Sequence, residues 1–171
     1  MRFSPKAVAN ALIDIARDHG EPLSPMKLQK LVYFSHGWHL AINDEPLINE
    51  QIEAWKFGPV IRSLYHHFKH LGNSPIEDHA CAHDVKQHGG EFILEVHIPS
   101  LQGHKDADFA SQLLDKIWEV YGHLSAVQLS KMTHQPGSPW HQIWEPMKDN
   151  PIKGTDIPNP IIRDWFREQA A

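Results

Sequence analysis

The stretch that decides the fold is KLQKLVYFSHGWHLAINDEPLINEQIEAWKFGPVIRSLY, residues Lys27–Tyr65. It begins inside a helix predicted over residues 24–42. Ser24-Pro25, like Ser4-Pro5 and Ser138-Pro139, offers an N-cap hydroxyl followed by proline at the first helical position, where the missing N–H costs nothing. Leu31–Phe34 makes this helix apolar nearly all round, which is typical of a central buried helix. The rest of the fold is therefore expected to pack around it.

A strand and a second helix follow that central helix. Residues 47–57 predict a strand or hairpin arm that ends in a turn at Gly58-Pro59. A helix from about Val60 to Leu71 comes next, with apolar and basic faces, and Gly72-Asn73 ends it. This stretch contains aromatic residues, turns and helix starts but no catalytic constellation, so it predicts packing and recognition rather than chemistry.

The remaining segments extend the same pattern in both directions. Glu91–Ile98 alternates apolar and polar residues and predicts a strand, whereas residues 73–90 and 99–105 are polar and predict loops. Further helices are predicted from about Ser4 to His19, from Asp106 to Tyr121, from Ser125 with a capping box to Gln128, and around Ile161–Phe166. The fold class is mainly α (α+β): a single compact domain, residues 1–171, of about five to seven helices with a small antiparallel sheet.

Bulk composition limits the class of protein. The chain has 171 residues, a formal net charge of −5 and one cysteine, Cys81, so an internal disulfide is excluded. No run of Lys or Arg marks a non-specific nucleic-acid surface. The first ten residues lack the apolar core of a signal peptide, and no stretch approaches the ~20 apolar residues that span a bilayer. We expect a soluble, cytoplasmic protein with no membrane partner and no cofactor.

Histidine is the compositional outlier, with 14 residues. Three groupings have the spacing of metal ligands: His66 with His70, His36 with His39, and His79 with Cys81 and His83. No HExxH motif and no acidic partner at a catalytic spacing accompanies them, and no G-x-S-x-G elbow is present. We therefore expect solvated surface histidines, no metal site and no enzyme. A histidine-rich, metal-dependent hydrolase is the least favoured alternative.

Tryptophan raises the question of which aromatic side chains are exposed. In the predicted strand Ile52 and Ala54 share one face, and Glu53 and Trp55 share the other. An exposed Trp55 rimmed by polar groups would be a binding anchor, whereas a covering helix or C-terminal segment would make it structural. A register shift of one residue would reverse the assignment, so both alternatives stay open.

Other large and charged side chains have structural alternatives as well. Trp140, in the turn at 137–140, is expected to form part of a hydrophobic clamp that closes the fold over the central helix. Lys27 and Lys30 lie on the otherwise apolar helix and are expected to extend to solvent or to pair with an acid such as Glu53.

Two motifs resemble one known family, the Panacea-domain antitoxins, which are SocA-like or phage-associated and GepA-like. In that family a K-L-Q-K-L-x-Y-(F/A) helix is followed by a tryptophan and then by E-A-W-x-(Y/F)-G-P-V. The matching residues here are Lys27, Leu28, Gln29, Lys30, Leu31, Tyr33 and Phe34, then Trp38, then Glu53, Ala54, Trp55, Phe57, Gly58, Pro59 and Val60. The family's second motif is matched by Leu124, Ser125, Leu129, Ser130, Thr133, His134, Pro139 and Trp140.

The resemblance implies an α-rich fold with a small sheet, no established enzymatic activity, and neutralisation of a cognate protein toxin, typically encoded by a neighbouring gene, in a stable heterocomplex. Some members resemble proteolytic adaptors for a AAA+ protease, and some carry an extra DNA-binding segment. The first predicted helix starts at Ser4, so such a preceding segment is not expected here. The expected toxin-binding residues are Trp55, Lys56, His134 and Trp140.

A DNA-binding transcriptional regulator is the alternative from another class. Residues 125–134 follow another helix and can pass for the recognition helix of a helix-turn-helix motif. This helix has one lysine and no arginine, and the chain is net acidic. Weak DNA binding that does not depend on salt would exclude this alternative.

Overall fold

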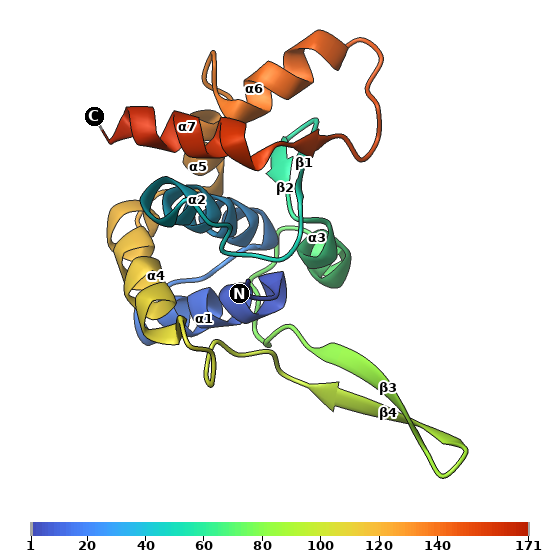
Figure 1. Ribbon diagram of the computed structural model, residues 1–171. Coiled ribbons are helices and arrows are strands. Elements are labelled where there is room, and N and C mark those ends of the chain that lie inside the picture. The colour runs from blue at the N-terminus through green and yellow to red at the C-terminus, as the bar shows by residue number, and fades with distance from the viewer. Residues whose placement is uncertain (1, 171) are drawn as a thin grey trace.

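The computed structural model describes residues 2–170 (Figure 1), so the outermost residues of the predicted 1–171 domain lie outside the description. Within this range there are seven α-helices and two small antiparallel sheets, which confirms the predicted fold class. The helices are α1 Pro5–Asp18, α2 Pro25–Asn43, α3 Arg62–Phe68, α4 Ala107–Tyr121, α5 Ala126–Thr133, α6 Pro139–Trp144 and α7 Asn159–Gln169, and short 3₁₀ turns follow α3 at Lys69–Leu71 and α6 at Glu145–Met147. The strands are β1 Ile52–Trp55, β2 Gly58–Val60, β3 Ala82–His88, β4 Glu91–His97 and β5 Asp156–Ile157.

Helix α2 is the centre of the molecule, as predicted. It is buried on nearly every face and packs against α1, α4, α5 and α7 (Figure 1). Helix α7 approaches α2 closely at Gly37, where an added Cβ would lie 2.2 Å from the ring of Phe166. Only glycine lets the aromatic ring of Phe166 lie this close to the α2 backbone.

Serine-proline pairs start three of the helices, as the sequence predicts. The side chains of Ser4, Ser24 and Ser138 accept hydrogen bonds from backbone N–H groups in the first turns of α1, α2 and α6. Each hydroxyl satisfies one of the donors that a helix start leaves unpaired. Local sequence therefore sets these three boundaries.

The first sheet has the order β2-β1-β5 and differs from the prediction at one turn. Gly58-Pro59 does not form the turn but opens β2, where Gly58 pairs with Trp55 and Pro59 with Ala54. The chain reverses one step earlier, at Lys56-Phe57. Proline is tolerated at this place because β2 is an edge strand. Since Val60 belongs to β2, α3 begins at Arg62 rather than at Val60.

The second sheet shows that the loop predicted at residues 73–90 is partly wrong. The predicted loop 73–90 contains β3, which pairs residue for residue with β4 in a hairpin that extends away from the helices (Figure 1). Gly89 and Gly90 both have positive φ, 61° and 86°, as a two-residue hairpin turn requires. The strand predicted at 91–98 is confirmed as β4, yet every residue of β4 is exposed.

One buried side chain of α1 holds the base of this hairpin. The Asn10 amide nitrogen donates to the carbonyls of Ala80 and Pro99, both at 2.9 Å, and its oxygen accepts from the Ala80 N–H at 2.7 Å. Both ends of the segment that carries β3 and β4 are thus attached to the helical core, while the strands themselves lie outside it.

Candidate functional site

The four residues predicted to bind a partner all lie around the turn between β1 and β2. Trp55 ends β1 and Lys56 begins the turn. The indole N–H of Trp140 on α6 donates to the carbonyl of Trp55 at 2.7 Å. The ring of His134, which ends α5, lies 3.9 Å from the ring of Trp140 between centroids. Two distant parts of the chain are therefore brought together.

These residues differ in exposure: the buried ones support the turn, and the exposed ones are accessible to a partner. Trp140 is 6% exposed, and its bond to the Trp55 carbonyl supports the turn from inside the fold. Lys56 and its neighbour Phe57 are exposed, and Phe57 is 72% exposed. The side chains available to a partner are thus those at the tip of the turn.

Trp55 lies between the two predicted alternatives, an exposed binding anchor and a covered structural residue. Ile52 and Ala54 are buried, so the strand has the register that directs Trp55 to the other face. The indole N–H donates to a carboxylate oxygen of Glu53 at 2.8 Å, and Tyr65 of α3 lies against the ring at 4.7 Å between centroids. Trp55 is half-buried, held in one orientation, and open on the side that lines a cavity.

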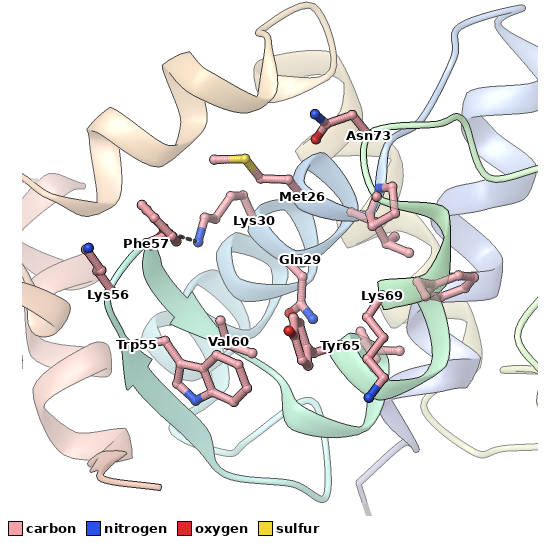
Figure 2. A pocket seen from close by; sticks show the side chains of 15 residues that line it. Met26, Gln29, Lys30, Trp55, Lys56, Phe57, Val60, Tyr65, Lys69 and Asn73 are labelled. Atoms are coloured by element: carbon pink, nitrogen blue, oxygen red, sulfur yellow. Dashed lines mark hydrogen bonds between the residues drawn. The ribbon is translucent and has the colours of Figure 1, made fainter. Parts of the chain in front are cut away.

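This cavity has a volume of about 670 Å³ and lies between the start of α2, the β1–β2 turn and α3. Figure 2 shows Trp55, Val60 and Tyr65 on one side of it and Met26 and Asn73 on another. Its deeper wall consists of the buried side chains of Leu28, Leu64 and Phe68. A concave, mostly apolar surface of this size is typical of a binding site.

Lys30 of α2 supports the β1–β2 turn through hydrogen bonds to its backbone. Its ammonium nitrogen is 3.1 Å from both the Phe57 and the Pro59 carbonyl oxygens and donates to each (Figure 2 marks the bond to Phe57). A Cβ at residue 58 would lie 2.6 Å from this nitrogen, so glycine is needed there, at φ 109°. Burial lowers the pKa of the Lys30 amine to about 7.

Neither lysine of the α2 motif pairs with Glu53, which corrects the prediction. Lys27 donates to the carbonyl of Gly122. Burial lowers its pKa, and the negative charge of the exposed Glu21 opposes that shift. The buried Glu53 instead meets Arg62 at 3.5 Å and the Trp55 indole. Both lysines therefore bind backbone carbonyls and hold chain segments together.

Gln29 is a support whose role sequence reasoning did not identify. Its amide nitrogen donates to the Ile61 carbonyl at 3.0 Å, and its oxygen accepts from the Ile61 N–H at 2.9 Å. This pair of bonds continues the strand pairing beyond β2 with a side chain, and it ties the entry to α3 onto α2. The K-L-Q-K motif, in which Gln29 directly precedes Lys30, was the sequence signal that could have indicated this supporting role.

The other motif residues also occupy packing and capping positions. Leu28, Leu31 and Tyr33 are buried in α2, and Trp38 donates its indole N–H to the Tyr121 hydroxyl at 2.9 Å. Ser125 caps α5 with the predicted box to Gln128, and half-buried Leu124 packs against the core. These residues form the scaffold that carries the cavity.

The histidine groupings do not assemble into a ligand set. His36 and His39 are buried rather than solvated, which corrects the prediction for this pair. His36 hydrogen-bonds to Asn159 at 3.0 Å, and burial lowers its pKa to about 4. His79 contacts Asp14 at 2.6 Å. Across residues 2–170, no three His, Cys, Asp or Glu side chains are placed to hold a metal ion.

Among the helices of residues 2–170, none combines the length and the apolar character needed to cross a bilayer.

Comparison with known proteins gives two agreeing matches. Residues 28–141 match the family described as antitoxin SocA-like, Panacea domain. The antitoxin SocA of Caulobacter vibrioides is 35% identical over 164 residues, which cover 96% of this chain and 82% of that protein. No solved structure matches the chain. Two-thirds of the chain, including most of α2, most of the cavity lining and Trp140, falls within the family match, and the chain belongs to the SocA-like, Panacea-domain antitoxin family.

Proposed function

We propose that this antitoxin-family protein binds a cognate protein toxin in a stable heterocomplex and neutralises it through the β1–β2 turn and the adjoining cavity. The partner would be the product of a neighbouring gene. The observation that carries the proposal is a preformed apolar cavity whose lip, at Lys56 and Phe57, is exposed while its supports are buried. Exposed aromatic anchors on a rigid base are typical of binding hot spots.

Side-chain hydrogen bonds hold the backbone of this surface in one conformation. Gln29 and Lys30 of α2 and Trp140 of α6 bind backbone groups in and next to the β1–β2 pair. Little conformational entropy would then be lost when a partner binds, because the contacting backbone is already ordered. The arrangement suits recognition, and the proposal includes no catalytic step.

Delivery of the bound toxin to a AAA+ protease is the second part of the proposal. A toxin held in a complex can be inactivated by blockage alone or by degradation, and these differ in one observable. If the chain acts as an adaptor, toxin half-life in cells falls when this chain is co-expressed. If it only blocks, the toxin becomes more stable in the complex.

The experiment that tests the function is rescue coupled to co-purification. The neighbouring gene product is expressed alone, with this chain, and with the variant Phe57→Ser. We expect growth arrest, rescue with co-elution, and loss of both, respectively. Val120→Ser, at an exposed apolar residue of α4, is the matched control and should rescue. A harmless neighbour that does not co-elute would contradict the proposal.

A further inference from the structure

Charge is distributed unevenly around the cavity. Its basic lining residues are Lys30, Lys56 and Lys69, and no carboxylate of residues 2–170 lines it, although the whole chain has a net charge of −5. Lys56 and Lys69 are exposed, and neither forms an ion pair within residues 2–170. Figure 2 shows them on opposite sides of the cavity. Two available cations therefore flank an apolar centre.

Buried as well as partly exposed side chains line the apolar centre. Leu28, Leu64 and Phe68 close its base, and Trp55 and Tyr65 form a fixed aromatic wall. A side chain of aromatic or leucine size that enters this space leaves water and contacts aromatic and aliphatic groups. The same surface disfavours a basic segment, which would place like charges against the two lysines.

From this pattern we infer that the cavity binds a short acidic-apolar segment of the partner, which inserts one bulky apolar side chain and sets flanking carboxylates against Lys56 and Lys69. The inference rests on the proposed function, because it names the chemistry of the toxin segment that the site receives. Lys30 has a different part: it positions the turn that carries Lys56, since both of its acceptors are carbonyls of residues 57 and 59.

Nucleic acid fits the same site less well. Phosphate backbones are recognised by rows of cations, and binding then depends steeply on salt. Here two exposed lysines are separated by an apolar cavity, and no arginine lines it. The geometry favours a protein segment that alternates apolar and acidic side chains.

A titration with matched charge reversals tests the inference. The neighbouring toxin is titrated against the wild type, against Lys56→Glu/Lys69→Glu, and against Lys105→Glu/Lys116→Glu near and on α4. Both doubles change the net charge equally, so long-range charge effects cancel. We expect the cavity double to weaken binding by at least about 30-fold and the control double by less than about 3-fold. Thermal melting of both doubles confirms that they fold.

Salt dependence provides a second readout. Wild-type affinity should fall between low and high salt, and the cavity double should lose most of that dependence. If the two doubles bind alike, the inference is wrong although the proposed function stands. If the wild type itself neither binds nor rescues, the proposed function fails instead.

Selection of random 12-residue peptides on the immobilised chain tests the partner chemistry without the toxin. Enriched peptides are expected to carry Trp, Phe or Leu beside Asp or Glu, and to lose binding to the cavity double. Enrichment of basic peptides, or of none, would overturn the inference.

Discussion

Two regions of this molecule expose large apolar side chains, and they do so in opposite ways. The cavity beside the β1–β2 turn is concave and supported by buried groups of α2 and α6. The β3–β4 hairpin is an arm whose strands are exposed throughout β4 and nearly throughout β3. Exposure alone therefore does not identify a binding site; the supporting contacts behind the exposed residues distinguish the two.

Register explains why the hairpin is apolar on one face. Val85 lies opposite Leu94, and the directly paired residues of an antiparallel ladder share a face. Phe92 and Val96 lie on that same face, and Phe92 is 76% exposed. The other face carries ion pairs, such as Lys86 with Glu95. A two-stranded hairpin is marginally stable alone, so its order depends on its attachment at Asn10.

The largest effect is expected where the cavity is supported. Trp140→Ala should lower the free energy of unfolding by about 3–5 kcal/mol, because it removes a buried indole and its bond to the Trp55 carbonyl. Urea denaturation measures this. The control Phe92→Ala removes an exposed ring from the hairpin and should change stability by less than about 0.5 kcal/mol. Equal losses would remove the distinction between the two regions.

A smaller loss is expected where the hairpin is attached. Asn10→Ala should cost about 2–3 kcal/mol, since it leaves a buried N–H and two carbonyls without their partner. Hydrogen exchange at the Ala80 amide should accelerate in the variant. Asn150→Ala, at an exposed asparagine, is the control. Unchanged exchange at Ala80 would show that the hairpin base does not depend on Asn10.

Lys30 gives the cavity a pH dependence. Its folded pKa of about 7 lies below the ordinary 10.5, so between these values the unfolded chain binds the extra proton. The contribution of this site to stability therefore rises with pH, by about 2 kcal/mol from pH 7 to pH 9.

The stability difference between wild type and Lys30→Met, measured by urea denaturation across this range, isolates that slope from Lys27, whose pKa is also lowered. A difference that stays constant with pH would mean that Lys30 remains charged in the folded chain.

The smallest effect is expected on the hairpin face itself. Phe92→Ser with Leu94→Ser should leave the free energy of unfolding within about 0.5 kcal/mol of wild type, because both side chains are exposed. Leu114→Ser, at a buried position of α4, is the matched control and should cost several times more. A large loss in the double variant would mean that the folded chain covers this face.

The sequence predicts best where local chemistry decides. The three serine-proline starts and the Ser125 box predict helix starts because the cap and its acceptor lie within one turn. Residues 82–88, AHDVKQH, contain one β-branched residue, so their strand depends on pairing with β4 rather than on propensity.

The predicted partner-binding residues could be grouped from the sequence, but the contacts between them could not. The two motifs contain Trp55, His134 and Trp140, Lys56 stands at a variable position of the first motif, and these four residues lie around one turn. Trp140 binds the carbonyl of Trp55, 85 residues away along the chain, and such a contact leaves no local pattern. For the same reason the sequence predicts that Lys30 extends to solvent or pairs with an acid such as Glu53, whereas its acceptors are backbone carbonyls that come into place only once the turn has formed.

Hydrogen exchange of the toxin complex, compared with the free chain, tests most directly whether the supported cavity is the recognition surface. The account predicts slower exchange on binding in residues 55–73, which contain the turn and α3, with little change in 82–98. Protection confined to residues 82–98, with the turn and α3 unchanged, would contradict it and assign recognition to the hairpin.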